Sequence, residues 1–337
     1  MEEDKRLQRE AFMQAVFDFA KRDSDVYFLS ADFGSTILEK EFIPSLPRQF
    51  LHTGIAEQAM INVATGLALD GKKPYAYAMD CFITPRAFEQ IKVASACFQN
   101  SREPLSLAVV GVGGGFGYSD AGPTHYTTEV IGTMRTIANI EILSPADNLA
   151  VIEAANISYS KPGLKYIRLD RQNFPQVYHN GLHEKMREEG LCEIVEGNDI
   201  CFVTTGYTTH KAVKASEALR AEGISAGVID VFRLEPFNRD DFCDYIHRYK
   251  KLVSWEEHFL NGGLGSIVAE AMVDKGVSKP LKRIGVPSHY YFENDSEGGG
   301  RAYIHRAAGI DLDTVLDKTK RFIFAQRESS AYTTEQE

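Results

Sequence analysis

Cysteines are few, and none of them is spaced as a metal site or a redox pair. The 337-residue chain has five cysteines and no CxxC motif, so we expect reduced thiols in a cytosolic protein. They are Cys81, Cys97, Cys192, Cys201 and Cys243. The sequence also lacks an HExxH motif, a GxSxG elbow and a loop ending in GK[ST]. These absences argue against zinc peptidases, serine hydrolases and P-loop nucleotide hydrolases.

Long apolar runs and an excess of basic residues are missing as well. No stretch of about 18 apolar residues occurs, so no membrane-spanning helix is expected. The first 12 residues are mostly charged or polar and contain no signal-peptide core. The formal net charge is −10, which argues against binding to nucleic acid or to an anionic membrane. We therefore expect a soluble cytoplasmic protein.

Apolar segments typical of strands alternate with helical patterns along most of the chain. Residues 4–21 have apolar side chains at helical spacing, and residues 26–33 follow as a short buried strand. This alternation predicts an α/β fold with two consecutive, parallel or mostly parallel domains. The predicted organisation is a first domain over residues 1–180, a linker at 181–198, a second domain at 199–325 and a polar tail at 326–337.

Three features of the first domain could carry chemistry. Glu57 is a lone acid in the otherwise apolar or small-residue stretch GIAEQAM, and Phe82 lies just past a predicted strand, in a predicted strand-to-helix loop. A glycine-rich loop, GGGFGYSDAGPTH, ends at His125. Ligands of parallel α/β sheets bind where such loops leave the carboxyl ends of the strands. Taken singly, each residue also has an ordinary explanation: a surface acid at a helix start, a core aromatic and a loop histidine.

The order of these motifs resembles one enzyme family. TGIAEQAM, then Phe82, then GPTH, then RQNFPQ resembles the pyrimidine-binding domain of transketolases, and VSWEEHFLNGGLGSIVAEAM looks like their C-terminal domain. The resemblance covers residues from about 7 to 324. It implies thiamine diphosphate as cofactor and the transfer of a two-carbon ketol unit between sugars, with the cofactor acting as an electron sink.

The resemblance also implies roles for individual residues. Glu57 would hydrogen-bond N1′ of the aminopyrimidine and favour the imino tautomer, whose nitrogen takes the thiazolium C2 proton. Phe82 would stack on the pyrimidine, Ile55 would shape its pocket, and His125 would line the channel above the thiazolium.

The residues expected to bind substrate match the family pattern less completely than those expected to bind the cofactor. The expected substrate-binding residues are Arg9, Asp32, Thr36, Asp120 and Arg171. Planar guanidinium groups suit a sugar phosphate, so a phosphorylated sugar is favoured. The family histidine upstream of GPTH is replaced by Gly113, and Asp120 lies one place before the usual aspartate.

One essential part of the family's cofactor site is missing. The GDG motif, which with a downstream asparagine supplies Mg²⁺ ligands, does not occur in this sequence. The chain therefore resembles the C-terminal half of a split transketolase. We expect a separate partner chain to hold the diphosphate and Mg²⁺, no metal ligands in this chain, an α₂β₂ assembly, and no activity without the partner.

Three alternatives remain open. Two keep the fold: the β-subunit of a 2-oxo-acid dehydrogenase, and a deoxyxylulose-phosphate-synthase-like enzyme that uses pyruvate as donor. The third is a non-catalytic scaffold of the same fold, which the presence of Glu57 disfavours.

Overall fold

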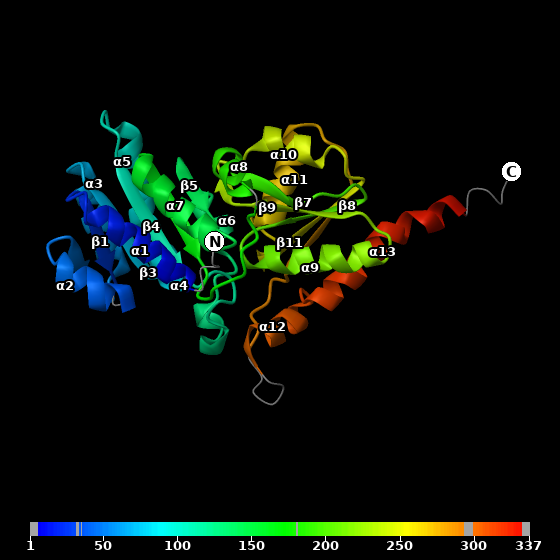
Figure 1. Ribbon diagram of the computed structural model, residues 1–337, viewed down its shortest axis with the longest axis horizontal. Coiled ribbons are helices and arrows are strands. Elements are labelled where there is room, and N and C mark those ends of the chain that lie inside the picture. The colour runs from blue at the N-terminus through cyan, green and yellow to red at the C-terminus, as the bar shows by residue number, and fades with distance from the viewer. Residues whose placement is uncertain (1–5, 32–33, 35, 180, 293–298, 332–337) are drawn as a thin grey trace.

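Two mostly parallel sheets, each packed with helices, form the two halves of the molecule (Figure 1). The computed structural model describes residues 6–31, 34, 36–179, 181–292 and 299–331, with side chains described as far as residue 325. The helices are α1 (Gln8–Ala20), α2 (Ile43–Ser45), α3 (Glu57–Leu69), α4 (Asp80–Arg86), α5 (Phe88–Asn100), α6 (Val130–Met134), α7 (Asn148–Ser160), α8 (Leu182–Glu189), α9 (Tyr207–Ala221), α10 (Arg239–Ile246), α11 (Leu264–Asp274), α12 (Gly300–Ala308) and α13 (Leu312–Ala331). Three short helical turns are η1 (Leu38–Phe42), η2 (Ser119–Ala121) and η3 (Pro123–His125). The strands are β1 (Val26–Ser30), β2 (Phe50–His52), β3 (Lys73–Met79), β4 (Ser106–Val112), β5 (Ile140–Leu143), β6 (Gly163–Leu169), β7 (Leu191–Val195), β8 (Ile200–Thr204), β9 (Ala226–Val231), β10 (Arg233–Glu235), β11 (Lys251–Phe259) and β12 (Leu281–Val286).

The first sheet has seven strands in the order β10–β5–β6–β4–β3–β1–β2. Only the β10–β5 pair is antiparallel. The central strands β3, β4 and β6 are buried along nearly their whole length because helices cover both faces. Helices α3 and α5 contribute to one hydrophobic cluster, and α1 and α7 contribute to another. This arrangement confirms the predicted α/β class.

The second sheet has five strands in the order β12–β11–β8–β9–β7, with only β7–β9 antiparallel. Helix α11 packs on this sheet within a cluster that also contains α6 and β5 of the first half. Strand β10, which follows β9 in the chain, joins the edge of the first sheet through Arg233 and Leu143. The two halves therefore share both a core and a sheet edge.

The range expected as a linker is folded. Residues 181–198 contain helix α8 and strand β7, the edge strand of the second sheet. The charges that suggested a loop lie on the outer face of α8, while Met186 is buried beneath it. Helix α13 similarly continues to Ala331, into the expected tail. The division of the chain at residues 180 and 198 stays a prediction.

The carboxyl ends of the parallel strands bring the expected site loops to one edge of the first sheet. β2 leads into α3 and Glu57, β3 leads into α4 and Phe82, and β4 leads into the glycine-rich loop. β6 ends at Leu169, two residues before Arg171. This edge is the expected ligand-binding position in an open α/β sheet.

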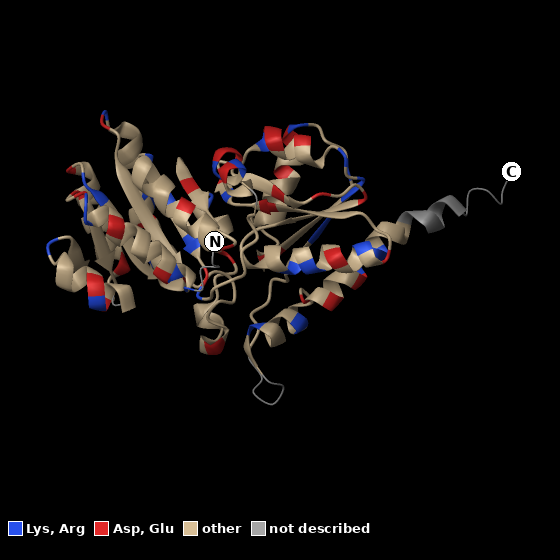
Figure 2. Ribbon diagram, in the orientation of Figure 1, with Lys and Arg blue, Asp and Glu red and all other residues tan. Residues whose placement is uncertain are grey.

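Acidic and basic residues are interspersed along the ribbon of both halves (Figure 2). Figure 2 shows no continuous basic stripe on the ribbon that it draws in colour, in keeping with the net charge of −10. Within the described residues, no helix is long and apolar enough to cross a membrane.

Candidate functional site

Glu57 begins helix α3 and is almost completely buried, with 4% of its side chain exposed. The turn before it contains Gly54 at φ +68°, a left-handed conformation that favours glycine. Nη1 of Arg86 lies 3.1 Å from Oε1 and 3.2 Å from Oε2 of Glu57. The Arg86 side chain is itself 46% exposed. Glu57 is therefore a buried acid that pairs with a half-exposed arginine.

Phe82 lies beside this ion pair. The guanidinium carbon of Arg86 is 4.1 Å from the centre of the Phe82 ring. On the sequence alone Phe82 was expected in a loop, but it lies within α4, which begins directly at the end of β3. Because Phe82 and Arg86 are four residues apart in one helix, their side chains lie on the same face. The structure thus brings Glu57, Phe82 and Arg86 together.

His125 reaches the same cluster from the glycine-rich loop. Its ring centre is 5.2 Å from that of Phe82, with the ring planes at 70°. Thr124 Oγ1 lies 2.9 Å from His125 Nδ1. The loop returns on itself here, because Thr127 N–H donates to the Gly115 carbonyl at 3.0 Å. The three residues that the sequence proposed for cofactor chemistry therefore meet from three separate segments.

Gly113 occupies the position where the family pattern has a histidine. Its φ is +103°, and a Cβ atom there would lie 2.2 Å from the Tyr118 ring. Tyr118 thus fills the space that a side chain at position 113 would need. Burial raises the pKa of the Tyr118 phenol to about 12, and the positive charges of Arg9 and Arg171 partly oppose that rise. Both expected phosphate-binding arginines therefore act on one buried phenol.

Asp120 and Arg171 form an ion pair at the outer rim, with Arg171 Nη1 2.7 Å from Asp120 Oδ1. The Arg171 guanidinium also lies 4.8 Å from the centre of the Tyr118 ring. The hydrogen bond from Arg171 lowers the pKa of Asp120. The Asp120 side chain is exposed and that of Arg171 is partly exposed, so solvent screens the pair. Arg171 is thus placed to exchange its carboxylate partner for another anion.

The other four residues predicted for the site have no side-chain contact with Glu57, Phe82 or His125 among the contacts described above. Ile55 is 71% exposed, two residues before the start of α3, and Thr36 is exposed near the start of η1. Arg9 lies on α1, with Nε 3.7 Å from Glu10. Asp32 lies outside the described residues. Of these four residues, only Ile55 is close in sequence to the cluster of Glu57, Phe82, Arg86 and His125, which we call the Glu57 cluster.

Arg86, which belongs to the candidate site, and Asp80, a buried acid on the same helix, were not predicted. Arg86 pairs with Glu57, and Asp80 lies beneath the start of α4, where the Tyr166 hydroxyl is 2.8 Å from both of its carboxylate oxygens. Burial raises the pKa of Asp80 to about 6. A Cβ at Gly111 would lie 2.2 Å from Asp80, so the strand must carry glycine there. The charged residues flanking Phe82 in DCFITPR were the available signal.

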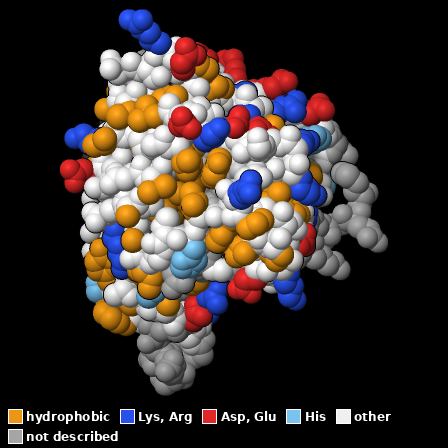
Figure 3. Space-filling model, turned by 90° about the vertical axis from the view of Figure 1, so that its left-hand side faces the viewer, with side chains coloured by type: hydrophobic (Ala, Val, Ile, Leu, Met, Phe, Trp, Pro, Cys, Tyr) orange, Lys and Arg blue, Asp and Glu red, His pale blue; other side chains and the backbone are white. Residues whose placement is uncertain are grey.

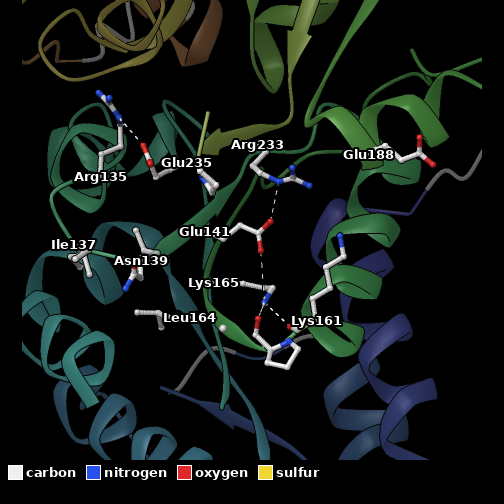
Figure 4. Close-up of a pocket in the computed structure, with 15 residues that line it drawn as sticks. Arg135, Ile137, Asn139, Glu141, Lys161, Leu164, Lys165, Glu188, Arg233 and Glu235 are labelled. Carbon is white, nitrogen blue, oxygen red and sulfur yellow. Dashed lines mark hydrogen bonds and ion pairs between the residues drawn. The ribbon is translucent and has the colours of Figure 1, made fainter. Parts of the chain in front are cut away.

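A cavity of about 600 Å³ lies elsewhere, at the amino ends of β5 and β6 (Figure 4). Its charged side chains are largely paired with one another: Arg233 Nε is 3.0 Å from Glu141, and the buried Lys165 Nζ is 3.7 Å from the same carboxylate. Burial lowers the pKa of Lys165. None of the predicted site residues lines this cavity. The candidate site is therefore the Glu57 cluster.

The chemistry of the cluster suits an aminopyrimidine. One flat, nitrogen-bearing group, the Arg86 guanidinium, already contacts both the Glu57 carboxylate and the Phe82 ring. A planar ring with nitrogen donors can make the same two kinds of contact. Across the described part of the chain, no three His, Cys, Asp or Glu side chains come together as a metal site.

Comparison with known proteins identifies both halves of the chain. The profile of the transketolase pyrimidine-binding domain matches residues 5–176, and that of the transketolase C-terminal domain matches residues 190–295. One subunit of apulose-4-phosphate transketolase from Phocaeicola vulgatus is 30% identical, over 94% of this chain and 97% of that protein. The corresponding protein from Actinobacillus succinogenes is 32% identical, over 91% and 94%.

A solved structure described as a split-gene transketolase, an inactive β4 tetramer, is also similar. It superposes with a TM-score of 0.78 at 28% identity, over 93% of this chain and 97% of that one. Membership of this family implies dependence on thiamine diphosphate. The chain belongs to the transketolase family, as an enzyme subunit made of the pyrimidine-binding and C-terminal domains.

Proposed function

We propose that this chain supplies the pyrimidine-binding half of a two-chain transketolase that moves a two-carbon ketol unit between sugar phosphates. The observation that carries the proposal is the buried carboxylate of Glu57, placed with Phe82 at the carboxyl edge of the sheet. The similarity to single subunits of two-chain transketolases, over nearly their full length, supports the two-chain organisation.

Each residue of the cluster has a distinct task in this proposal. Glu57 holds a proton at N1′ of the aminopyrimidine, and Phe82 orients the ring by stacking. His125 lies against the Phe82 ring and from there exchanges protons with the substrate. When bound, thiamine diphosphate supplies an electron sink for the two-carbon fragment.

The diphosphate and Mg²⁺ belong to the partner chain in this proposal. This chain has no GDG motif. Helices α3 and α5 and the turn before α3 carry exposed apolar side chains that a partner would cover: Ile55, Val63, Leu69 and Val93, which are 71%, 46%, 54% and 51% exposed. Figure 3 shows apolar side chains gathered over this end of the molecule. We propose a cytoplasmic α₂β₂ assembly in which this face meets the partner.

Sugar-phosphate binding follows from the two arginines near Tyr118. Arg171 gives up Asp120 for a substrate phosphate, since a phosphate forms stronger charge-assisted bonds than a screened surface carboxylate. Arg9 adds charge from α1, as its effect on the Tyr118 phenol indicates. Asp120, once released, can accept a hydrogen bond from a sugar hydroxyl, and Thr36 and Asp32 complete the proposed substrate set.

Reconstitution tests the function directly. The chain is mixed with the GDG-containing chain of the same organism, thiamine diphosphate and Mg²⁺, and ketol transfer from a ketose phosphate to an aldose phosphate is measured. We expect activity from the mixture and none from either chain alone. Glu57→Gln is expected to lower the rate about 100-fold or more while the complex still forms. Glu89→Gln, an exposed acid at the start of α5, is the matched control.

Assays with other donor substrates distinguish the proposed function from the alternative reactions. Decarboxylation of a 2-oxo acid, or condensation with pyruvate as donor, would replace the proposed function with the dehydrogenase or deoxyxylulose-phosphate-synthase reaction. A complex that is inactive with every donor, or that ignores Glu57→Gln, would favour the scaffold.

A further inference from the structure

A buried group of charged side chains joins the C-terminal domain to the root of the glycine-rich loop. Glu257 on β11 and Arg301 on α12 belong to the second half of the chain, while Asp170 follows β6 of the first. Arg301 Nε donates to Glu257 Oε1 at 2.7 Å, and its Nη2 donates to Asp170 Oδ2 at 2.8 Å. His305 pairs with Glu257 as well. All four side chains are buried.

The loop itself is fixed to this cluster through its backbone. Phe116 N–H donates to Glu257 Oε2 at 3.1 Å. A Cβ at Gly115 would lie 2.0 Å from the same oxygen, so the carboxylate fits directly against the glycine. Gly115 also accepts the N–H of Thr127, two residues beyond His125. The position of Glu257 thus sets both the start of the loop and the part that returns to the site.

The second carboxylate, Asp170, is connected to the loop through the next residue in the chain. Asp170 is followed directly by Arg171, which pairs with Asp120 at 2.7 Å. Arg301 is in turn held over the Tyr207 ring of α9, with its guanidinium carbon 3.7 Å from the ring centre. Burial alone would keep Glu257 protonated, yet Arg301 and His305 lower its pKa, so the cluster stays charged. A buried charge cluster is held only where its geometry is well fixed.

From these contacts we propose that Glu257 and Arg301 of the C-terminal domain are positioning residues for the glycine-rich loop, and so for His125 and Asp120. The C-terminal domain thereby acts on the site without touching cofactor or substrate. This inference rests on the proposed function for the tasks of His125 and Asp120, whereas the ordering of the loop is measurable without it.

Glu57, Phe82 and Arg86 lie on α3 and α4, outside the loop. Loosening the loop should therefore disturb catalysis more than cofactor binding, which gives a signature that general destabilisation would not give. The test variant is Arg301→Lys, which keeps the charge but cannot bridge two carboxylates with one planar group. Tyr207→Leu is a milder variant that removes only the ring beneath Arg301.

The matched control is Glu270→Gln. Glu270 on α11 pairs with Arg135 of the first half at 2.5 Å, so this pair also joins the two halves but has no contact with the loop. Hydrogen exchange is measured by mass spectrometry on the chain alone and on the reconstituted complex with thiamine diphosphate. Steady-state kinetics and cofactor binding are measured on the complex.

We expect amide exchange over residues 113–127 to rise about tenfold in Arg301→Lys, less in Tyr207→Leu and not at all in Glu270→Gln. In the complex, kcat should fall about tenfold in Arg301→Lys, while the Kd of the cofactor stays within about twofold. Unchanged loop exchange, or equal loosening of both halves by all folded variants, overturns the proposal. If Arg301→Lys does not fold, Tyr207→Leu decides by the same readouts. If the complex transfers no ketol unit, the proposed function fails, while faster loop exchange still supports the loop's attachment.

Discussion

Arg86 occupies both contacts that the aminopyrimidine needs, and replacing it should tighten cofactor binding. Its guanidinium bonds Glu57 at 3.1 Å and lies 4.1 Å from the Phe82 ring centre. A ring that stacks on Phe82 and bonds Glu57 from this side must displace it. The cost of that displacement is part of the measured affinity, as in any equilibrium between two competing contacts.

The free-energy cost of displacing Arg86 can be worked out from how exposed Arg86 and Glu57 are. A surface ion pair contributes about 0–1 kcal/mol, and we take the upper part of that range because the Glu57 carboxylate is buried although Arg86 is 46% exposed. The cation–π contact adds about 0.5–1 kcal/mol. A total of about 1.5 kcal/mol corresponds to roughly a tenfold change in Kd.

Calorimetric titration of the reconstituted complex with thiamine diphosphate and Mg²⁺ measures this effect. Arg86→Gln is expected to lower the Kd about tenfold, and Arg86→Lys should lower it less because the charge remains. Arg102→Gln, an exposed arginine after α5, is the control and should change nothing. A weaker affinity in Arg86→Gln would refute the reasoning, because Arg86 would then belong to the cofactor-bound site.

Three further substitutions test other parts of the account. Phe82→Leu should weaken cofactor binding about fivefold in the same titration, since stacking is lost while apolar area is kept, and an unchanged Kd would remove Phe82 from the site. Gly113→Ala should lower the free energy of unfolding by more than about 2 kcal/mol, measured with urea, because a Cβ would strike Tyr118. Gly181→Ala, at a left-handed position with open space around the Cβ, should cost only about 1 kcal/mol, and equal losses would contradict the explanation. Burial raises the pKa of Asp230 to about 7, so folding takes up a proton: its contribution is complete below the unfolded pKa and is lost as the pH rises through about 7. Asp230→Asn should therefore flatten the decline in stability between about pH 4 and pH 7, by up to about 1.4 kcal/mol per pH unit, and parallel stability curves for both proteins would count against this origin.

The fold was predictable because its signals are local. Buried strands such as SLAVVGV and GLKYIRL have the apolar runs of a parallel sheet, and these segments form β4 and β6. Residues 181–198 were expected to form a linker because the segment KMREEG is mostly charged. In the structure this segment belongs to an amphipathic helix in which only Met186 is buried. Strand β10 pairs with β5 across about ninety residues of sequence, a contact that no local pattern encodes.

The site was predictable where residue type limits function. A carboxylate in an apolar helix start marked Glu57, and the family order of motifs marked Phe82 and His125, which the structure brings together. Arg86 was signalled only weakly, by its place beside Phe82 in DCFITPR, because an arginine at the end of a helix is usually a solvated charge. The contact between Glu257 and Phe116 joins residues 141 positions apart, so only the three-dimensional fold reveals it.

A crystal structure of the reconstituted complex with thiamine diphosphate and Mg²⁺ tests the central claim most directly. We predict that the Glu57 carboxylate lies within about 2.6–3.0 Å of N1′ of the aminopyrimidine, with Arg86 displaced from it and the ring stacked on Phe82. A complex in which Glu57 still pairs with Arg86 and the aminopyrimidine binds elsewhere would contradict the account.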